Sequence, residues 1–313
     1  MFETFLSILT NALLPVLLIV GFGYGLQRWR PMESGTLVTL NLYFFVPIYL
    51  FVRVLDSTLL WSDIIRVGVA LLLPVLVIGA IAWFALSKLR LPGDTLAAVL
   101  IGGLFANCGN FGVPVAEIAF GPAGGEVHAI VVLFANFSIF SIAYMMLAMG
   151  RGLGASAILN YFKLPYFYCV VAALLIRDTG LRDWMPDWLH NCSHIIANGL
   201  VPIALVTLGA QLAKRVGLPN WKLLTPALLL KLMILPGASF ATVWMLGMWP
   251  WPGVVLVLAA SAPTAINPLL LAMQLDGDAD TLSDCVFWTT LFSAVSVAIW
   301  MTILKVIVPD AFV

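Results

Sequence analysis

Charged residues are scarce in this chain of 313 residues: Asp, Glu, Lys and Arg make up 10% of it, whereas 62% of the residues are hydrophobic. Soluble domains carry about a quarter charged residues, so this composition indicates a chain embedded in lipid. The fifteen basic and fifteen acidic residues cancel. Because no net field is left to attract nucleic acid, we exclude nucleic-acid binding.

Close sets of metal ligands and catalytic signatures are missing as well. The four cysteines stand singly and lack the Cys/His spacing of a metal site, and the three histidines lie near loop edges. These residues are Cys108, Cys169, Cys192, Cys285, His128, His190 and His194. Neither HExxH nor GxSxG occurs. We therefore expect no metal site, no cofactor and no enzymatic activity.

Long apolar runs recur along the whole chain. A helix needs about 20 apolar residues to cross the hydrocarbon core, and a window of that length predicts about ten spans joined by short loops. The spans run approximately over residues 5–26, 36–54, 64–86, 95–120, 127–149, 157–176, 191–213, 223–247, 252–275 and 283–307. No basic segment precedes the first run, so we expect a true span there and not a signal peptide. The sequence predicts an all-α, polytopic protein of the lipid bilayer.

Basic residues concentrate in alternate loops. Nine Lys or Arg residues lie in loops after odd-numbered spans, and five lie on the opposite side. Because basic loops are retained in the cytoplasm, this bias predicts that both termini lie on the non-cytoplasmic side. The loop after span nine is acidic, with Asp276, Asp278 and Asp280, but acidic residues weigh little in this rule.

Two patterns recur at an offset of about 155 residues, which indicates an internal repeat. Val46-Pro47-Ile48 in span two returns as Val201-Pro202-Ile203 in span seven, and spans four and nine both contain Asn and Pro at their centres. The repeats cover residues 1–150 and 151–313, with five spans each. A unit with an odd number of spans must enter the membrane inverted in its second copy, as in many secondary transporters. The alternative is a chance match in a chain rich in Leu, Val and Pro.

The middle of span four is rich in polar residues and helix breakers. It has the sequence NCGNFGVP from Asn107 to Pro114, which includes Asn110 and Gly112. Glycine and proline weaken a helix, and the freed backbone groups cannot be left facing lipid. We therefore expect a broken helix that lines a cavity or meets another broken segment.

Span nine contains the counterpart SAPTAINP, with Thr264, Asn267 and Pro268. Two crossed breaks place helix N-termini, which carry a partial positive charge, at the centre of the bilayer. This arrangement suits a small anion, most simply a carboxylate, to which the Asn and Thr side chains can hydrogen-bond. The alternative is a pair of proline kinks whose asparagines only bridge helices.

Ionisable residues inside spans are costly and are therefore functional candidates. Lys231 in span eight can neutralise a bound carboxylate or compete with a coupling cation, or it can snorkel to the interface. Glu117, one turn after Pro114, can carry a proton or hold a cation, or it forms an ion pair. Gln211 in span seven can bind substrate or bridge helices. The substrate-binding candidates are Asn107, Asn110, Gly112, Pro114, Lys231, Thr264, Asn267 and Pro268, and the coupling candidates are Glu117 and Gln211.

These motifs resemble the auxin efflux carrier family, whose bacterial members include malonate and malate permeases. The similar segments are NCGNFGVPVAEIAFG, APTAINPLLLAMQLDG, and PVLLIVGFGYGLQRWR followed by LNLYFFVPIYLF, and the resemblance covers essentially the whole chain. It implies ten spans in two inverted five-span repeats, with a scaffold domain and a transport domain whose proline-broken helices cross near Pro114 and Pro268. It also implies an organic anion as substrate, an elevator-like motion and a homodimer.

The chain lacks the long central loop of the plant auxin carriers, because residues 150–163 supply only a short linker. It is similar to the compact prokaryotic branch, which implies the cell inner membrane as its location. Auxin itself is therefore not the expected substrate.

The sequence is compatible with two other functions. A cation/proton antiporter of related inverted-repeat fold usually has acidic residues at the midplane, whereas this centre offers Asn and Thr, with Glu117 as the nearest acid. A channel is the second alternative, and saturable flux with counterflow distinguishes a carrier from it. The sequence favours a secondary transporter of a small organic anion such as malonate or malate, with coupling to protons, to sodium or to neither left open.

Overall fold

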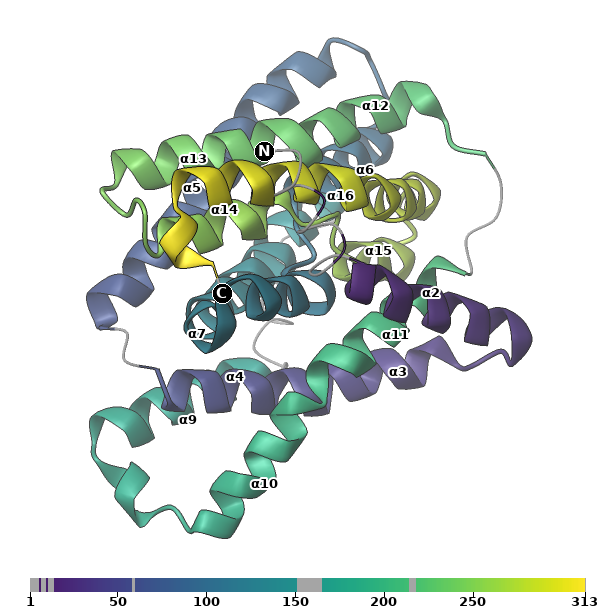
Figure 1. Ribbon diagram of the computed structural model, residues 1–313. Helices are drawn as coiled ribbons and strands as arrows, with labels where there is room; N and C mark the ends of the chain where they lie inside the picture. The colour runs from purple at the N-terminus through teal and green to yellow at the C-terminus, as the bar shows by residue number, and fades with distance from the viewer. Residues whose placement is uncertain are drawn as a thin grey trace.

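Helices build the structure. The computed structural model describes residues 6, 10, 14–57, 60–150, 165–213 and 218–312, and no β-strand occurs within these ranges (Figure 1). The α-helices are α2 (Leu14–Trp29), α3 (Ser34–Leu40), α4 (Val46–Leu55), α5 (Trp61–Ser87), α6 (Gly93–Leu104), α7 (Val113–Ser138), α8 (Tyr144–Gly150), α9 (Pro165–Asp178), α10 (Asp187–Asn198), α11 (Leu200–Leu212), α12 (Trp221–Leu229), α13 (Leu235–Met245), α14 (Gly253–Ser261), α15 (Asn267–Gln274) and α16 (Ala279–Ile307). Shorter π-helical or 3-10 turns are η2 (Asn41–Phe45), η3 (Cys108–Gly112), η4 (Ile139–Ala143), η6 (Leu181–Trp184), η7 (Leu230–Ile234) and η8 (Pro309–Ala311).

Five helical stretches among the described residues are long and apolar enough to cross a membrane. They are Trp61–Ser87, Cys108–Gly150, Asp187–Leu212, Trp221–Met245 and Ala279–Ile307. The predicted all-α, multi-pass membrane protein is thus confirmed in its class. The count of ten spans stays a prediction, because the expected first and sixth spans begin outside the described residues.

The longest stretch, Cys108–Gly150, cannot be one straight span. Its 43 residues correspond to about 65 Å of helix, roughly twice the thickness of the hydrocarbon core. The chain bends at Gly121, whose φ of 62° and ψ of −158° are not helical, and Pro122 follows it. Since a side chain is strained at this φ, glycine allows the turn between the predicted spans four and five.

The helices pack into two groups. In the lower group of Figure 1, α2 packs against α11, and α4 packs against α9 and α10. The upper group contains α5 to α8 and α12 to α16, with α12 and α13 at the top of Figure 1 and α7 near its middle. In this group α6 contacts α8, α12 and α16, and α13 contacts α14. The groups meet where α7 contacts α4 and where η3 contacts α11.

Two glycines bring the backbones of α2 and α11 together. A β-carbon at Gly209 would overlap the backbone carbonyl of Val20, and one at Gly23 would overlap the carbonyl of Val206. Small residues permit such close helix contacts in membranes, where there is no hydrophobic force between helices. The pair therefore fixes α11 against α2.

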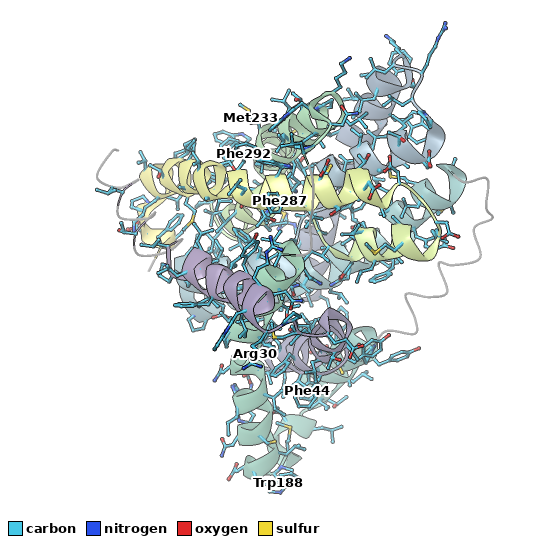
Figure 2. All side chains as sticks on the ribbon, turned by 90° about the vertical axis from the view of Figure 1, so that its right-hand side faces the viewer. Arg30, Phe44, Trp188, Met233, Phe287 and Phe292 are labelled. Atoms are coloured by element: carbon cyan, nitrogen blue, oxygen red, sulfur yellow. The ribbon has the colours of Figure 1, made fainter. Side chains whose placement is uncertain are left out.

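Large apolar side chains cover the outer surface. Ile65, Ile81 and Phe84 of α5 are all more than half exposed, and Figure 2 shows Trp188 at the far end of the molecule and Met233 at its periphery. An apolar surface of this extent indicates contact with lipid rather than with water.

Part of the predicted topology falls outside the described residues. This holds for the loop residues Arg151, Lys163, Lys214 and Arg215, which contribute to the orientation, and for the linker after residue 150. The division into residues 1–150 and 151–313 and the side of the termini therefore stay predictions.

Candidate functional site

The first break interrupts the helix of predicted span four. Helix α6 ends at Leu104, and Phe105 is extended with φ of −99° and ψ of 118°. The chain becomes helical again at η3, where the side chain of Asn107 accepts a hydrogen bond from the backbone N–H of Asn110. Pro114 is the second residue of α7, directly after this π-helical turn. Capping by Asn107 thus explains where the helix restarts.

The second break lies in predicted span nine. Helix α14 ends at Ser261 and α15 begins at Asn267, with Pro268 in its first turn. Pro263 stands in the segment between the two helices, where no helical N–H is required. Both predicted helix breaks are therefore present at the predicted residues.

The two breaks cross and bond to each other. Ala106 and Thr264 form an isolated antiparallel bridge, in which Asn107 N donates to the Pro263 oxygen at 2.7 Å and Ala265 N donates to the Phe105 oxygen at 2.8 Å. These bonds satisfy backbone groups that a broken helix would otherwise leave unpaired in the membrane.

Thr264 strengthens this crossing with its side chain. Its hydroxyl donates to the Gly102 oxygen of α6 at 2.5 Å, and its backbone N–H donates to the Thr289 hydroxyl of α16 at 2.9 Å. Thr264 is fully buried. It therefore holds the break in place.

A cavity of about 40 Å³ lies beside the crossing. It is bounded by η2 and α11 of the lower group and by η3, α7 and the second break of the upper group. Its lining comprises Asn41, Val46, Ala106, Asn107, Cys108, Gly109, Asn110, Val132, Ala135, Asn136, Ile139, Thr207, Gln211, Ala265, Ile266 and Asn267. None of these side chains carries a charge. The cavity is therefore a neutral, polar site between the two groups of helices.

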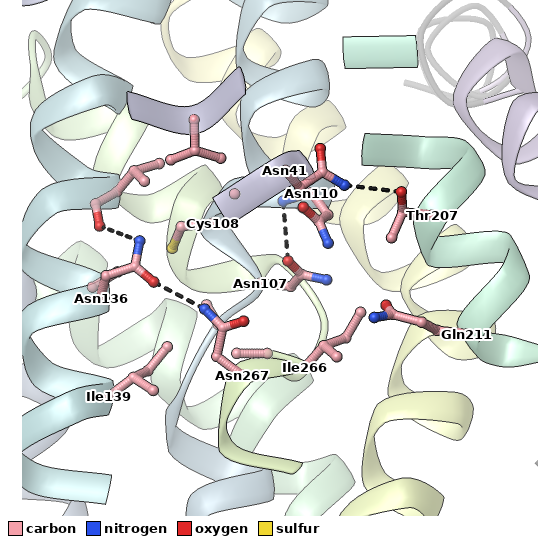
Figure 3. A pocket seen from close by; sticks show the side chains of 16 residues that line it. Asn41, Asn107, Cys108, Asn110, Asn136, Ile139, Thr207, Gln211, Ile266 and Asn267 are labelled. Atoms are coloured by element: carbon pink, nitrogen blue, oxygen red, sulfur yellow. Dashed lines mark hydrogen bonds between the residues drawn. The ribbon is translucent and has the colours of Figure 1, made fainter. Parts of the chain in front are cut away.

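Hydrogen bonds fix several of the lining side chains (Figure 3). Asn41 donates to the Thr207 hydroxyl at 2.9 Å, and Asn267 donates to the Asn136 oxygen at 3.1 Å. The Asn107 oxygen accepts the Asn110 N–H at 3.2 Å. This last bond sets the orientation of the Asn107 amide, so its nitrogen is the atom left to face the cavity.

Three lining residues keep a buried polar atom without a partner among the described residues. They are Oδ1 of Asn41, Nδ2 of Asn107 and Oε1 of Gln211. In Figure 3 the side chains of Asn107 and Gln211 extend into the cavity from opposite sides. Because an unpaired buried polar group costs about 1–3 kcal/mol, three around one cavity indicate a place for a polar ligand or for water.

Helix N-termini border the cavity. Gly109 and Asn110 belong to the first turn of the helix that starts at η3, and Asn267 is the first residue of α15. A helix N-terminus carries about half a positive charge. The two N-termini therefore contribute partial positive charge at the edge of the cavity.

Lys231 stands behind the second break and not in the cavity lining. Its side chain has no exposed area, and Nζ donates to the Ala260 oxygen in the last turn of α14 at 3.0 Å. A cation at a helix C-terminus interacts favourably with the helix dipole. In this conformation Lys231 neither reaches the membrane interface nor lines the cavity.

The predicted site residues thus divide into two sets. Asn107, Asn110, Asn267 and Gln211 line the cavity. The others lie around it and shape the breaks or the packing: Gly112, Pro114, Thr264, Pro268, Lys231 and Glu117. Gly112 donates its N–H to the backbone carbonyl of Asn107 at 2.9 Å, and a β-carbon at Gly112 would meet the side chain of His128.

Glu117 takes part in a partly buried polar cluster between α4 and α7. It forms an ion pair with Arg53 and accepts a hydrogen bond from the Tyr49 hydroxyl at 3.0 Å, while the Arg53 guanidinium lies 5.3 Å from the centre of the Tyr49 ring. An ion pair is one of the alternatives that the sequence leaves open for Glu117, and this ion pair is present. It joins the two groups of helices.

Sequence reasoning missed three lining residues, Asn41, Asn136 and Thr207. Each lies inside an apolar predicted span, in spans two, five and seven respectively. Polar residues within spans are functional candidates by the same rule that singled out the charged ones. A search extended to uncharged polar residues would have found them.

Comparisons with known proteins agree with a membrane protein of this kind. The model of the family described as "Membrane transport protein" matches residues 8–157 and 149–301. An uncharacterized transporter of Methanocaldococcus jannaschii is 22% identical over 307 residues, which cover 94% of this chain and 98% of that protein. An uncharacterized transporter of Methanothermobacter thermautotrophicus is 24% identical over 300 residues, with the same coverage of 94% and 98%.

Proposed function

This chain belongs to the membrane transport protein family, the auxin efflux carrier-like family that its motifs resemble, and we propose that it is a secondary transporter of a small organic anion. Its family and its relatives are membrane transporters, not enzymes. We propose a mono- or dicarboxylate, such as malonate or malate, as the substrate. The site is the cavity at the crossing of the broken helices.

One observation supports an anion, and not a cation, as the substrate. The Asn107 amide nitrogen is a buried hydrogen-bond donor without a partner among the described residues, and it lines an uncharged cavity at a helix N-terminus. A carboxylate oxygen supplies the acceptor that this donor lacks, and a hydrogen bond to a charged group contributes about 1.5–3 kcal/mol. A cation would find no acidic side chain in the lining.

Alternating access is proposed as a movement of the upper group against the lower group. The cavity takes lining residues from both groups, so a shift of one against the other opens or closes it. The hydrogen bonds across the two breaks tie α6, α7, α14 and α15 to one another, which supports their moving as one body. This is the elevator-like motion of an inverted-repeat transporter.

Gln211 and Glu117 are proposed to contribute to coupling. The unpaired Gln211 oxygen can accept a hydrogen bond from a protonated carboxyl group, or it can ligate sodium. Glu117 lies in the cluster that joins α4 to α7, so a change in its charge would act on the contact between the two groups. Uptake measured at two pH values, and with sodium exchanged for potassium, separates proton coupling from sodium coupling.

Thermal stabilisation of the purified protein tests the substrate class. A bound ligand stabilises the folded state by RT ln(1 + [L]/Kd), which is about 2.7 kcal/mol when the ligand is at 100 times Kd. We expect a rise in unfolding temperature with at least one mono- or dicarboxylate and none with the matching amides or alcohols. Stabilisation only by sodium or another cation would contradict the anion carrier in favour of a cation/proton antiporter.

Flux into proteoliposomes tests the carrier mechanism. We expect uptake that saturates with the same carboxylate and is accelerated by unlabelled carboxylate on the opposite side. Flux that rises linearly with concentration and shows no counterflow would indicate a channel.

We also propose where the protein lies in the cell and how it is oriented there. Each chain has two inverted five-span repeats, and two chains form a homodimer in the inner membrane. Both termini of each chain lie on the non-cytoplasmic side. Single cysteines added at each terminus should react with an impermeant reagent in whole spheroplasts. Reaction only after lysis would contradict the orientation.

A further inference from the structure

A cluster of three residues with metal-binding side chains lies outside the cavity, where α10 meets the end of α4. Asp56 is the C-cap residue directly after α4, and His190 and His194 are one turn apart on α10. One ligand atom from each of the three residues lies within 4.8 Å of the others. Sequence spacing does not reveal this set, because His190 and His194 lie 134 and 138 residues beyond Asp56 along the chain.

Two of the three contacts in the cluster have nearly the spacing of zinc ligands. His190 Nε2 and His194 Nε2 are 3.2 Å apart, and His194 Nε2 is 3.1 Å from Asp56 Oδ2. His190 Nε2 lies 3.7 Å from the other carboxylate oxygen, Asp56 Oδ1. Tetrahedral Zn²⁺ with bonds of about 2.0–2.1 Å separates its ligand atoms by about 3.3–3.4 Å. We propose that Asp56, His190 and His194 form a binding site for a divalent transition metal of the zinc class.

Two features of the cluster fit a metal site. Nε2 of each imidazole faces the other ring and the carboxylate, so two neutral rings that carry their proton on Nδ1 direct both Nε2 lone pairs to one place. All three side chains are partly buried, which limits competing water.

Arg182 fits as a partner of the carboxylate. Its Nη2 donates to Asp56 Oδ1 at 2.7 Å, which leaves Oδ2 on the side of His194. Carboxylates that ligate metals are commonly held by a further hydrogen bond of this kind. The site has three protein ligands, so a water molecule completes the tetrahedron.

Such a site links two segments that lead to the cavity. Helix α4 follows η2, which carries Asn41, and α10 is followed after Gly199 by α11, which carries Thr207 and Gln211. A metal ion that ties α4 to α10 therefore holds both cavity-lining segments of the lower group at one end. The site does not depend on the identity of the transported anion.

The test is a titration of the purified, tag-free full chain with Zn²⁺, followed by calorimetry and by thermal unfolding. Cys192 is exposed on α10 between the two histidines, so all proteins carry Cys192→Ser to remove an adventitious ligand. We expect one Zn²⁺ per chain and a rise in unfolding temperature. His190→Ala, His194→Ala and Asp56→Asn should each weaken binding by roughly tenfold or more, since even partners of metal ligands affect affinity by about 10–100-fold.

Asp187→Asn is the matched control, because it removes an acidic residue from the first turn of the same helix and should bind Zn²⁺ like the Cys192→Ser protein. Equal affinity in the double variant His190→Ala/His194→Ala would overturn the proposal, as would a lack of stoichiometric binding. Parent-like affinity in Asp56→Asn would overturn the role of the carboxylate. Co²⁺ bound to the unaltered ligands gives a second readout, in which the intense visible bands of tetrahedral coordination support the site and the faint bands of octahedral coordination overturn it.

Discussion

The Asn107 amide offers the sharpest test of the substrate's charge. Its oxygen accepts the Asn110 N–H at 3.2 Å, while its nitrogen has no partner among the described residues. Asn107→Asp keeps the capping oxygen, because aspartate and asparagine are similarly good N-caps, and it replaces the donor with a negatively charged oxygen. The variant should therefore change the cavity from one that prefers an anion to one that prefers a cation, while it preserves the start of the helix.

The expected loss of binding free energy for an anion in Asn107→Asp has two parts. Losing a hydrogen bond to a charged group costs about 1.5–3 kcal/mol, and repulsion between unit charges about 4 Å apart adds about 4 kcal/mol at an effective dielectric constant of about 20. The sum of about 5.5–7 kcal/mol is a loss of affinity of roughly 10⁴–10⁵-fold. Asn107→Ser keeps a capping oxygen without adding charge, so it should lose only the first part, roughly 10–100-fold.

Carboxylate binding to the parent and to both variants is measured by thermal shift at pH 8, where a carboxylate in water is ionised. Unfolding temperatures without ligand serve as the control for folding. Parent-like carboxylate affinity in Asn107→Asp would refute an anion at this position. Sodium binding that improves in the same variant would move the site to a cation carrier.

Three further substitutions test the framework of the site. Thr264→Val removes the hydroxyl that donates to the Gly102 oxygen, so the free energy of unfolding should fall by about 1–3 kcal/mol; an unchanged denaturation midpoint would contradict this role. Lys231→Met removes a buried ammonium and spares its desolvation, so the unfolding temperature should be equal or higher. Carboxylate affinity should fall, because the positive charge behind the second break is lost. Unchanged affinity would leave Lys231 as a helix cap alone. Gly209→Val forces α2 away from α11 and should cost about 1–3 kcal/mol, whereas Gly25→Ala, which meets nothing within 4 Å, should be stable; equal stability of the two would contradict the close packing.

Local chemistry explains why the breaks could be predicted from sequence. Asn107, Pro114 and Pro268 act on the helix in which they stand, so their effect is visible in any window that contains them. The crossing was predicted from the match between two such windows. Its bonding, through Ala106 and Thr264, depends on register and could not be derived.

Long-range partners account for what the sequence did not reveal. Asn41 meets Thr207 and Asn136 meets Asn267 only because different helices converge, and no spacing within the chain encodes these pairs. Lys231 was expected to face a substrate or the interface, but its acceptor is a carbonyl freed by the break in α14. That carbonyl becomes available only once the helix has ended at Ser261.

The bridge between the two breaks also sets how often the centre of the protein opens. The N–H groups of Asn107 and Ala265 donate to carbonyls on the opposite break, so they exchange with deuterium only when the two segments separate. Amides protected in this way report the free energy of local opening. If the crossing moves as one body during transport, these two amides should stay protected throughout turnover, and their exchange should be as slow as that of the cores of α6 and α14.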